Sequence, residues 1–378
     1  MKSCHIVPSL EARYGGPSKS VLSLATALAL GGGDAELLAT EPGPGWSQAE
    51  GRLQIRTFRR DWPRSVCASG GLYSHLRTVD ADIVHHHSIW LRTLHYAHMA
   101  ARRLDVPLVV SPRGMMNPWA WRHHSRRKAL SRAFIHPGAL EAADGWHATS
   151  WEEAEALRAL GFQQPVCVAP NGVAAPSPED MAGQAEHWRR IVPDSSLRPI
   201  ALFYSRFHEK KRLLELIDLW LVYGPADWLL LVVGIPEDYT PRMIDDYVLR
   251  SGQRGRVRAY DGAGHPPPYA IASLFLLPSH SENFGLVIAE ALAHGVPALV
   301  TDTTPWSGIN DAGAGWCVRW QEFGAAIRAA TSEGLDSLRR RGAVGSDWII
   351  REFSWEKSAR AISEFYARLR SGTAGRPQ

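Results

Sequence analysis

The sequence predicts an α/β protein in two halves, each with a parallel sheet covered by helices. Short apolar stretches of strand length alternate with helical patterns along all 378 residues. Parallel sheets with helices on both faces require this order of elements. The length suits two domains of ordinary size, and a proline-rich stretch around Pro176 and Pro178 interrupts the pattern near the middle. We therefore predict two Rossmann-like domains joined by a short linker.

In the first half, a strand at His5 leads to a helix capped by Ser18 and stopped by the glycines at 31–33. A second helix is predicted over 150–160, because Ser150 suits an N-cap position and two glutamates follow in the first turn. Apolar composition places the further strands at residues 37–40, 82–85, 106–111, 145–148 and 166–169.

The second half repeats this alternation after the linker at 175–180. Near the end of the chain, Ser354 caps an amphipathic helix that is predicted to run to about Leu369. The strands of this half are predicted at residues 200–204, 228–234, 257–260, 274–277 and 296–300.

Composition and the N-terminal segment exclude several classes of protein. The chain is 45% hydrophobic and 21% charged, as globular proteins are. No apolar run approaches the roughly 20 residues that span a bilayer, and the apolar segment after Met1 is too short for a signal peptide. Four cysteines lie far apart without a Cys-x-x-Cys pair. We expect them to be reduced core residues of a cytoplasmic protein.

The net charge of +4 is unevenly distributed. Residues 1–175 contain 19 Lys and Arg against 14 Asp and Glu, a net +5, whereas the remainder contains 23 against 24, a net −1. An anionic partner for the first half is one interpretation: a membrane surface, a lipid pyrophosphate or a nucleic acid. A solvated, arginine-rich surface is the other.

The most informative stretch covers residues 278–290 (PSHSENFGLVIAE). It follows an apolar run of strand length and leads into a helix that is apolar nearly all round, which indicates a buried helix. Glu290 on this helix is then a carboxylate in the interior, which is costly unless something binds it. Glu282 and Asn283 precede the helix, and Gly285 lets a ligand approach its unpaired N–H groups. The stretch predicts an anion site at a helix N-terminus.

The two glutamates resemble the E-x7-E motif of the retaining glycosyltransferases of family 4, also called glycosyl transferase group 1. This resemblance implies that Glu282 lies beside the donor sugar and that Glu290 holds the ribose hydroxyls of the nucleotide. It implies a donor site completed by Asn283, Phe284, Gly285 and Leu286. Without the resemblance, Glu282 is interpreted as a capping residue and Glu290 as the partner of a buried arginine.

The resemblance also implies the GT-B fold, in which two Rossmann-like domains with parallel sheets have a cleft between them. We assign residues 1–174 to an N-terminal acceptor-binding domain and residues 175–353 to a C-terminal domain that binds the nucleotide sugar. The helix over 354–370 is expected to return to the N-terminal domain.

A basic loop follows the first strand of the second half, where doubly wound sheets bind ligands. In residues 204–211 (YSRFHEKK), Arg206 and Lys211 are spaced to clamp a diphosphate and to neutralise the charge that develops as a nucleotide leaves. The loop resembles the G-R-x4-K segment of family 4, with Ser205 in place of glycine, which implies catalytic roles for Arg206 and Lys211. If the motif is aligned one residue earlier, Lys210 has the role given to Lys211. The alternative to a ligand site is an exposed basic turn.

Two segments of the first half resemble further family motifs at the donor side. Gly15 and Gly16, in residues 11–17 (EARYGGP), resemble the Gly-Gly loop that faces the donor. The histidines of residues 82–87 (DIVHHH) resemble the H-x-H strand end, which implies that His87, or else His85, is a catalytic residue at the cleft floor.

A third segment, residues 111–119 (SPRGMMNPW), resembles the S-P-R-G-M segment of family members that build bacterial surface polysaccharides. Other members have a His-Asp pair at this place. The resemblance makes Arg113 our candidate for an anion contact in acceptor binding.

Metal binding by the three consecutive histidines is not expected. Their side chains alternate between the two faces of a strand, so His85, His86 and His87 cannot all bind one ion. No acidic or cysteine partner follows at ligand spacing. We expect His85 and His86 to be core histidines, and no metal or other cofactor besides the nucleoside diphosphate sugar as co-substrate.

A basic segment with tryptophans suits a membrane interface. At helical spacing its cations share a broad face, which predicts peripheral contact with anionic lipid at the inner face of the cell membrane. A solvated helix face is the alternative. The segment contains Trp119, Trp121, Arg122, Arg126, Arg127, Lys128 and Arg132.

These segments occur in the family's order along essentially the whole chain. The resemblance implies a metal-independent, retaining transferase of the hexosyltransferase type. Its donor is a nucleoside diphosphate sugar and its acceptor a lipid-linked or growing surface polysaccharide such as lipopolysaccharide. Two alternatives stay open: a nucleotide-sugar epimerase of the same fold, and a non-enzymatic nucleic-acid-binding protein, for which the sequence has no recognised motif.

Overall fold

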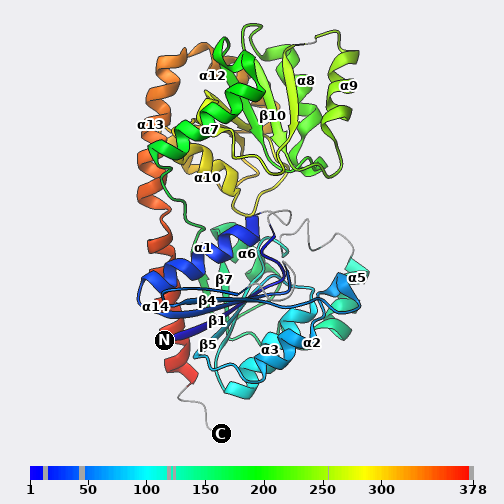
Figure 1. Ribbon diagram of the computed structural model, residues 1–378, viewed down its shortest axis with the longest axis vertical. Coiled ribbons are helices and arrows are strands. Elements are labelled where there is room, and N and C mark those ends of the chain that lie inside the picture. The colour runs from blue at the N-terminus through cyan, green and yellow to red at the C-terminus, as the bar shows by residue number, and fades with distance from the viewer. Residues whose placement is uncertain (12–15, 42–46, 117–120, 122–124, 254, 374–378) are drawn as a thin grey trace. The chain divides into compact units, whose positions relative to one another are not determined.

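The computed structural model describes residues 1–378 except 12–15, 42–46, 117–120, 122–124, 254 and 374–378 (Figure 1). The chain divides into two compact units: unit 1 is Met1–Gly172 with Phe353–Gln378, and unit 2 is Val173–Glu352. Part of the proline-rich stretch predicted as a linker instead begins helix α7 (Pro178–Ile191). The Ser177 side chain accepts a hydrogen bond from the Asp180 N–H, and proline suits the first turn of a helix.

Unit 1 is built on an eight-stranded sheet of order β3-β4-β2-β1-β5-β6-β7-β8. All neighbouring pairs are parallel except the antiparallel edge pair β3 and β4. This edge pair is absent from the strands that the sequence predicts. The strands are β1 (Lys2–Val7), β2 (Asp34–Ala39), β3 (Ser47–Glu50), β4 (Leu53–Thr57), β5 (Ile83–His87), β6 (Leu108–Ser111), β7 (Gly145–Ala148) and β8 (Val166–Val168).

Helices cover both faces of this sheet (Figure 1). Ile83 of β5 packs in one core cluster with side chains of α1 (Gly16–Leu30) and α14 (Trp355–Thr373), and its neighbour Val84 packs in another with α2 (Gly70–Leu76) and α3 (Arg92–Leu104). Because side chains alternate along a strand, His85 and His87 face α1 and α14, whereas His86 faces α3. The remaining helical segments are α5 (Ser125–Leu130), a π-helical turn (Ser131–Ile135), α6 (Trp151–Ala159) and a short 3-10 turn (Arg64–Val66).

Unit 2 is built on a six-stranded, wholly parallel sheet of order β11-β10-β9-β12-β13-β14. The two sheets and their helices confirm the predicted α/β class. The strands are β9 (Ile200–Tyr204), β10 (Leu229–Gly234), β11 (Val257–Asp261), β12 (Leu274–Leu277), β13 (Ala298–Thr301) and β14 (Gly315–Val318). The helices besides α7 are α8 (Leu213–Tyr223), α9 (Pro241–Arg250), α10 (Leu286–Ala293), α11 (Gly308–Asp311), α12 (Phe323–Ser332) and α13 (Leu335–Glu352).

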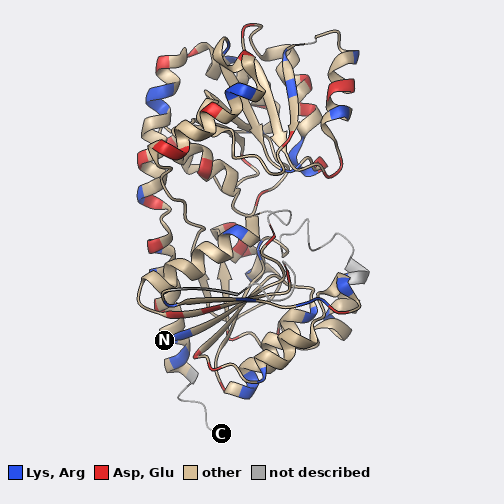
Figure 2. Ribbon diagram, viewed as in Figure 1, with Lys and Arg blue, Asp and Glu red and all other residues tan. Residues whose placement is uncertain are grey.

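Close packing in unit 2 brings α13 against the end of α10. A Cβ at Gly342 of α13 would lie 1.8 Å from the Gly295 carbonyl oxygen, so only glycine fits there. Both signs of charge are interspersed along the outer side of α13 (Figure 2). Across the described residues, no helix combines the length and the apolar character that crossing a membrane requires.

Candidate active site

Two loops of unit 2 meet at the carboxyl edge of its sheet. Strands β9 and β12 are neighbours, and the strand order reverses between them. The loop with Arg206 and Lys211 follows β9, and the loop with Glu282 follows β12. In open α/β sheets, ligands bind in the crevice beyond the carboxyl ends of the strands at such a reversal. Both predicted motifs therefore lie where a ligand is expected.

Lys211 and Glu282 form an ion pair across these two loops. Each side chain is 11% exposed, and the Ser279 hydroxyl donates a 2.6 Å hydrogen bond to Glu282 Oε1. Burial raises the pKa of the Glu282 carboxyl, but the Lys211 ammonium and the Ser279 hydroxyl together outweigh burial and bring this pKa below its ordinary value. Glu282 is therefore ionised at neutral pH and suits electrostatic stabilisation rather than proton donation.

Side chains from the end of β13 and from the segment after it hold the Glu282 loop. The hydroxyls of Thr301 and Thr303 donate hydrogen bonds of 2.8 and 2.6 Å to the Ser279 carbonyl oxygen. The Trp306 indole N–H donates to the Phe284 carbonyl oxygen. None of these three residues was predicted as a site residue. In the sequence they are visible only as a polar and aromatic run at and after the end of β13. Their contact with the Glu282 loop follows only from the pairing of β13 with β12.

Gly285 turns the chain into α10. Its φ of +78° lies in the left-handed region, and a Cβ there would lie 2.9 Å from Ile288 Cδ1 and 3.3 Å from the Trp306 indole nitrogen. Leu286 is the first residue of α10, and Asn283 and Phe284 precede the turn. The first N–H groups of a helix lack intrahelical acceptors and carry partial positive charge, so this end of α10 suits an anion.

Glu290 lies one turn further along α10. It is half-buried rather than interior as predicted, because Ala289, Ala291 and their apolar neighbours occupy the buried faces of the helix. The Tyr269 hydroxyl donates a 3.0 Å hydrogen bond to Glu290 Oε2. Burial first, and then the Glu290 charge, raise the pKa of Tyr204 to about 12 and that of Tyr269 well above its ordinary value. Both hydroxyls therefore keep their protons, and neither tyrosine was singled out from the sequence.

The two cations of the predicted clamp pair with different carboxylates: Lys211 with Glu282, and Arg206 with Glu237. Arg206, 47% exposed, donates two hydrogen bonds of 2.9 and 3.1 Å to the Glu237 carboxylate. Burial lowers the pKa of Lys210, and the charges of Lys211 and Arg206 act in the same direction, so the three cations lie within electrostatic range. A half-exposed ion pair contributes about 1 kcal/mol or less. An anionic ligand therefore competes with Glu237 for Arg206 at little cost.

In unit 1, four buried histidines gather on the sheet face toward α14. His5 comes from β1, His85 and His87 from β5, and His147 from β7, and none is more than 2% exposed. His86 lies on the opposite face, where its two nitrogens are 2.9 Å from Thr93 Oγ1 and from the Ser88 carbonyl oxygen.

A histidine from the neighbouring strand β1 joins two histidines of β5 in a group that could hold a metal ion. One ring nitrogen each of His5, His85 and His87 lies within 4.8 Å of the others. Alternation along β5 removes only His86 from this group, so the alternation argument alone does not exclude a metal site. The Arg113 guanidinium, however, lies 3.0 Å from His87 Nδ1, and a cation next to a ligand disfavours a bound metal ion.

Arg113 occupies the loop after β6, close to the reversal of strand order between β1 and β5. Its φ is +53°, and its Nη1 donates a 2.8 Å hydrogen bond to Asn171 Oδ1. The buried Glu153 carboxylate holds the same loop by accepting a hydrogen bond from the Gly114 N–H. Burial lowers the pKa of Arg113 to about 10, so it is charged at neutral pH. Neither Asn171 nor Glu153 was predicted as a site residue: Asn171 follows the end of β8, and Glu153 is one of the two first-turn glutamates of α6.

The predicted Gly-Gly loop is only partly described. Gly15 lies outside the described residues, and Gly16 is the first residue of α1, with open space where a Cβ would be. Arg113 Nη1 lies 3.5 Å from the Ser20 hydroxyl of the same helix. The beginning of α1 and the Arg113 loop are therefore neighbours within unit 1.

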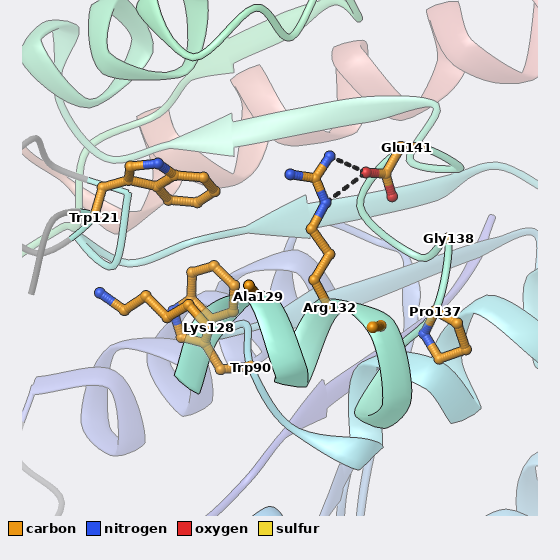
Figure 3. A pocket seen from close by; sticks show the side chains of 9 residues that line it. Trp90, Trp121, Lys128, Ala129, Arg132, Pro137, Gly138 and Glu141 are labelled. Carbon is orange, nitrogen blue, oxygen red and sulfur yellow. Dashed lines mark hydrogen bonds and ion pairs between the residues drawn. The ribbon is translucent and has the colours of Figure 1, made fainter. Parts of the chain in front are cut away.

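The predicted cationic face is interrupted where it is described. Trp119 and Arg122 lie outside the described residues, as do the side chains of Arg126 and Arg127. Lys128, 5.7 Å from the centre of the Trp90 ring, and Arg132 line a cavity of about 650 Å³ (Figure 3). Arg132 is paired with Glu141, 2.8 Å from Nε to Oε1, so its charge is partly neutralised. The π-helical turn also shifts the spacing after Leu130.

Comparison with known proteins gives two family matches. The family described as Glycosyltransferase Family 4 matches residues 14–175, and the family described as Glycosyl transferases group 1 matches residues 184–342. Together the two matches cover most of the chain and correspond to the two units.

Individual proteins agree with these matches. A D-inositol 3-phosphate glycosyltransferase of Xylanimonas cellulosilytica is 28% identical over 340 residues, which are 82% of this chain and 78% of that protein. The lipopolysaccharide core biosynthesis mannosyltransferase LpsB of Rhizobium meliloti is 32% identical over 110 residues, 28% of this chain and 31% of LpsB. The crystal structure of HepE from Anabaena in complex with UDP and glucose has a TM-score of 0.75 at 17% identity, covering 97% of this chain and 100% of HepE.

Proposed function

This chain belongs to the group 1 glycosyltransferases of the GT-B fold, and from that premise we propose that it is a retaining hexosyltransferase. Its donor is a nucleoside diphosphate sugar, and its acceptor is a lipid-linked or growing surface polysaccharide. The observation that carries the proposal is the Lys211–Glu282 pair beside the N-terminus of α10. It combines a buried cation, an ionised carboxylate and helix N–H groups at one sheet edge. A sugar diphosphate needs these charges where its bond breaks.

For the donor, we assign the diphosphate to Lys211, Arg206 and the N–H groups at the start of α10. Glu282 then lies beside the sugar, and Glu290 accepts hydrogen bonds from the ribose hydroxyls. The solved structure of HepE with UDP and glucose supports a nucleotide-bound donor. Two cationic side chains neutralise the leaving diphosphate in this assignment, which therefore requires no divalent cation.

The chemistry that follows is a front-face substitution, in which the anomeric carbon keeps its configuration. The bond from the anomeric carbon to the diphosphate oxygen breaks, and the acceptor oxygen bonds to the same face of that carbon. The acceptor proton passes to the departing diphosphate. No carboxylate opposite Glu282 is required, unlike in retaining glycosidases, and the ionised state of Glu282 supports a stabilising role.

For the acceptor, we assign unit 1, with Arg113 contacting an anionic group and Gly15 and Gly16 in the loop that faces the donor. Arg113 is protonated at neutral pH, and its guanidinium is hydrogen-bonded to three uncharged side chains, those of Asn171, Ser20 and His87. The nearby Glu153 carboxylate offsets part of this charge, and a buried guanidinium that is hydrogen-bonded to neutral groups still favours an anionic ligand. The resemblance to LpsB supports an acceptor of the surface-polysaccharide type.

We further propose that the enzyme works in the cytoplasm at the inner face of the membrane, through residues 126–134. Leu130 and Phe134, which are 58% and 70% exposed, add apolar side chains to the cations of this segment. Each well-placed cation contributes roughly 1 kcal/mol of attraction to anionic lipid. Flotation with vesicles tests this contact: binding is expected to need anionic lipid and to fall with added salt.

The matched variants in this flotation assay each replace three cations of unit 1. The first variant, in which Gln replaces Arg126, Arg127 and Lys128, should lose most of its vesicle binding. The second variant, in which Gln replaces the exposed Arg64, Arg77 and Arg102, should keep it. Equal loss in both variants, or equal binding to neutral vesicles, refutes contact through this segment.

Release of nucleoside diphosphate from a panel of nucleotide sugars tests the proposed reaction. One donor should release its nucleotide slowly alone and faster when lipid-linked or oligosaccharide acceptors are added. A metal chelator should leave both rates unchanged. Release from no donor, with acceptors present, contradicts the proposed function.

A further inference from the structure

The hydrogen bonds around His87 fix the position of every proton along one chain of side chains. A guanidinium has donors only, so His87 Nδ1, 3.0 Å from Arg113 Nη2, must be the unprotonated, accepting nitrogen. The proton of the neutral ring is then on Nε2, which donates over 3.1 Å to His5 Nδ1. His5 in turn carries its proton on Nε2, 3.2 Å from Ser3 Oγ. We call Arg113, His87, His5 and Ser3 the relay.

The surroundings keep both histidines of the relay neutral. His5 and His87 are fully buried. Burial first, and then neighbouring cationic groups including Arg113, lower the pKa of His5 to about 3 and that of His87 well below its ordinary value. The last member of the relay, Ser3, directs its hydroxyl toward the Asp34 carbonyl oxygen at 3.4 Å. Each donor on the path from Arg113 Nη2 to the backbone of β2 therefore meets an acceptor, whereas Arg113 Nε is buried without a partner among the described residues.

The relay leaves His87 no nitrogen for a substrate, since one ring nitrogen accepts from Arg113 and the other donates to His5. Arg113, in contrast, has a left-handed φ of +53°, which residues other than glycine rarely adopt. Neighbouring contacts must hold such a conformation. His87 and Asn171 supply two of them, at 3.0 and 2.8 Å from the guanidinium.

A metal ion in this cluster is the competing interpretation. His5, His85 and His87 offer three nitrogens within 4.8 Å, and His85 Nε2 is buried without a hydrogen-bond partner among the described residues. Ligation through His87 Nε2, however, leaves the proton on Nδ1, where it faces the Arg113 N–H. Two donors would then meet at 3.0 Å, so the donor set fits a metal ion poorly while Arg113 is in place.

We propose that His87 and His5 are positioning residues that hold the Arg113 guanidinium for an anionic group of the acceptor. This inference rests on the proposed function for the role of Arg113, and it replaces the catalytic role predicted for His87. The role of the two histidines is to orient the arginine, not to exchange protons with the substrate.

Kinetic coupling between His87 and Arg113 tests the proposal in the active enzyme. H87A and R113Q should each raise the acceptor KM roughly 10-fold or more, by analogy with a lost hydrogen bond to a charged group. The double variant should be no worse than R113Q alone, because both remove one function. H87N should restore much of the affinity, since its amide oxygen can accept near the position of Nδ1. Additive losses, or failure of H87N to restore affinity, overturn the proposal.

His86 provides the matched control. It is buried on the same strand, and both its nitrogens have partners outside the relay. H86A is expected to lower stability without raising the acceptor KM. An equal rise in KM in H86A and H87A assigns the effect to general disturbance of β5 and overturns the proposal.

The protonation state of His87 supplies a readout independent of catalysis. In 15N-histidine-labelled wild-type protein, NMR should show His87 as the neutral Nε2–H tautomer from pH 7 to pH 5. An Nδ1–H tautomer, an imidazolium in this range, or metal-bound shifts with one equivalent of zinc by elemental analysis would each overturn the relay. If no donor releases nucleotide, the proposed function fails, and this spectrum still decides the proton positions.

Discussion

Replacing Lys211 with Ala is expected to lower turnover by roughly 100-fold or more, by analogy with removal of an oxyanion donor. Lys211 is buried, and its ammonium already faces Glu282 at the carboxyl edge of the unit 2 sheet. A cation that meets charge developing on the departing diphosphate acts more strongly in the transition state than on the bound donor. Turnover should therefore fall more than the donor KM rises in steady-state assays of diphosphate release.

Two companion variants identify the cause of this loss. R206A should lower turnover in the same way but with little loss of stability, because Arg206 is half-exposed and its pair with Glu237 is weak. R212A removes a neighbouring cation that bonds instead to His280 and lies over the Trp320 ring, so its turnover should change little. A rise in KM at constant turnover in K211A and R206A shows that these residues only bind the donor, and it refutes the clamp.

Replacing Glu290 with Gln should weaken binding of the nucleoside diphosphate by about 1–3 kcal/mol, the scale of a lost hydrogen bond to a charged group. The corresponding loss of affinity is roughly 5-fold to 150-fold. A carboxylate accepts only, with about four acceptor positions, and the Tyr269 hydroxyl uses one of them. The ribose diol would donate to others, whereas the amide of Gln turns a donor toward it. Isothermal calorimetry with the nucleoside diphosphate measures this difference.

The control for this variant is E215Q, which removes one negative charge from the exposed side of α8 in the same unit. Its nucleotide affinity should match that of the wild type. Y269F should lie between the two, because it removes the hydrogen bond that orients the Glu290 carboxylate but keeps the carboxylate itself. Unchanged affinity in E290Q removes Glu290 from the site.

Sequence patterns predicted best those parts of unit 2 that lie within one strand-loop-helix segment. The position of Glu282 before α10, the turn at Gly285 and the buried character of α10 follow from local composition. So does the loop after β9, because Arg206 and Lys211 follow an apolar strand directly. That Lys211 reaches Glu282 depends on β9 lying beside β12, an order that the sequence alone does not contain.

The features that local patterns missed are contacts between neighbouring strands. Thr301, Thr303 and Trp306 hold the Glu282 loop because β13 lies beside β12. His5 joins His85 and His87 because β1 pairs with β5, and that pairing changed both the argument about metals and the role inferred for His87. The edge strand β3 was missed because its few residues, at Ser47–Glu50, have no apolar pattern.

The fate of the sugar tests the central claim most directly. The enzyme is incubated with a lipid-linked acceptor and the donor that releases its nucleotide, with the sugar isotopically labelled. Mass spectrometry then counts labelled glycan, and a nucleotide assay counts diphosphate. The account predicts one labelled glycan for each nucleoside diphosphate released, with the anomeric configuration of the donor retained in the product's NMR spectrum. Labelled free sugar in place of glycan, an inverted linkage, or an isomerised donor without nucleotide release would contradict it.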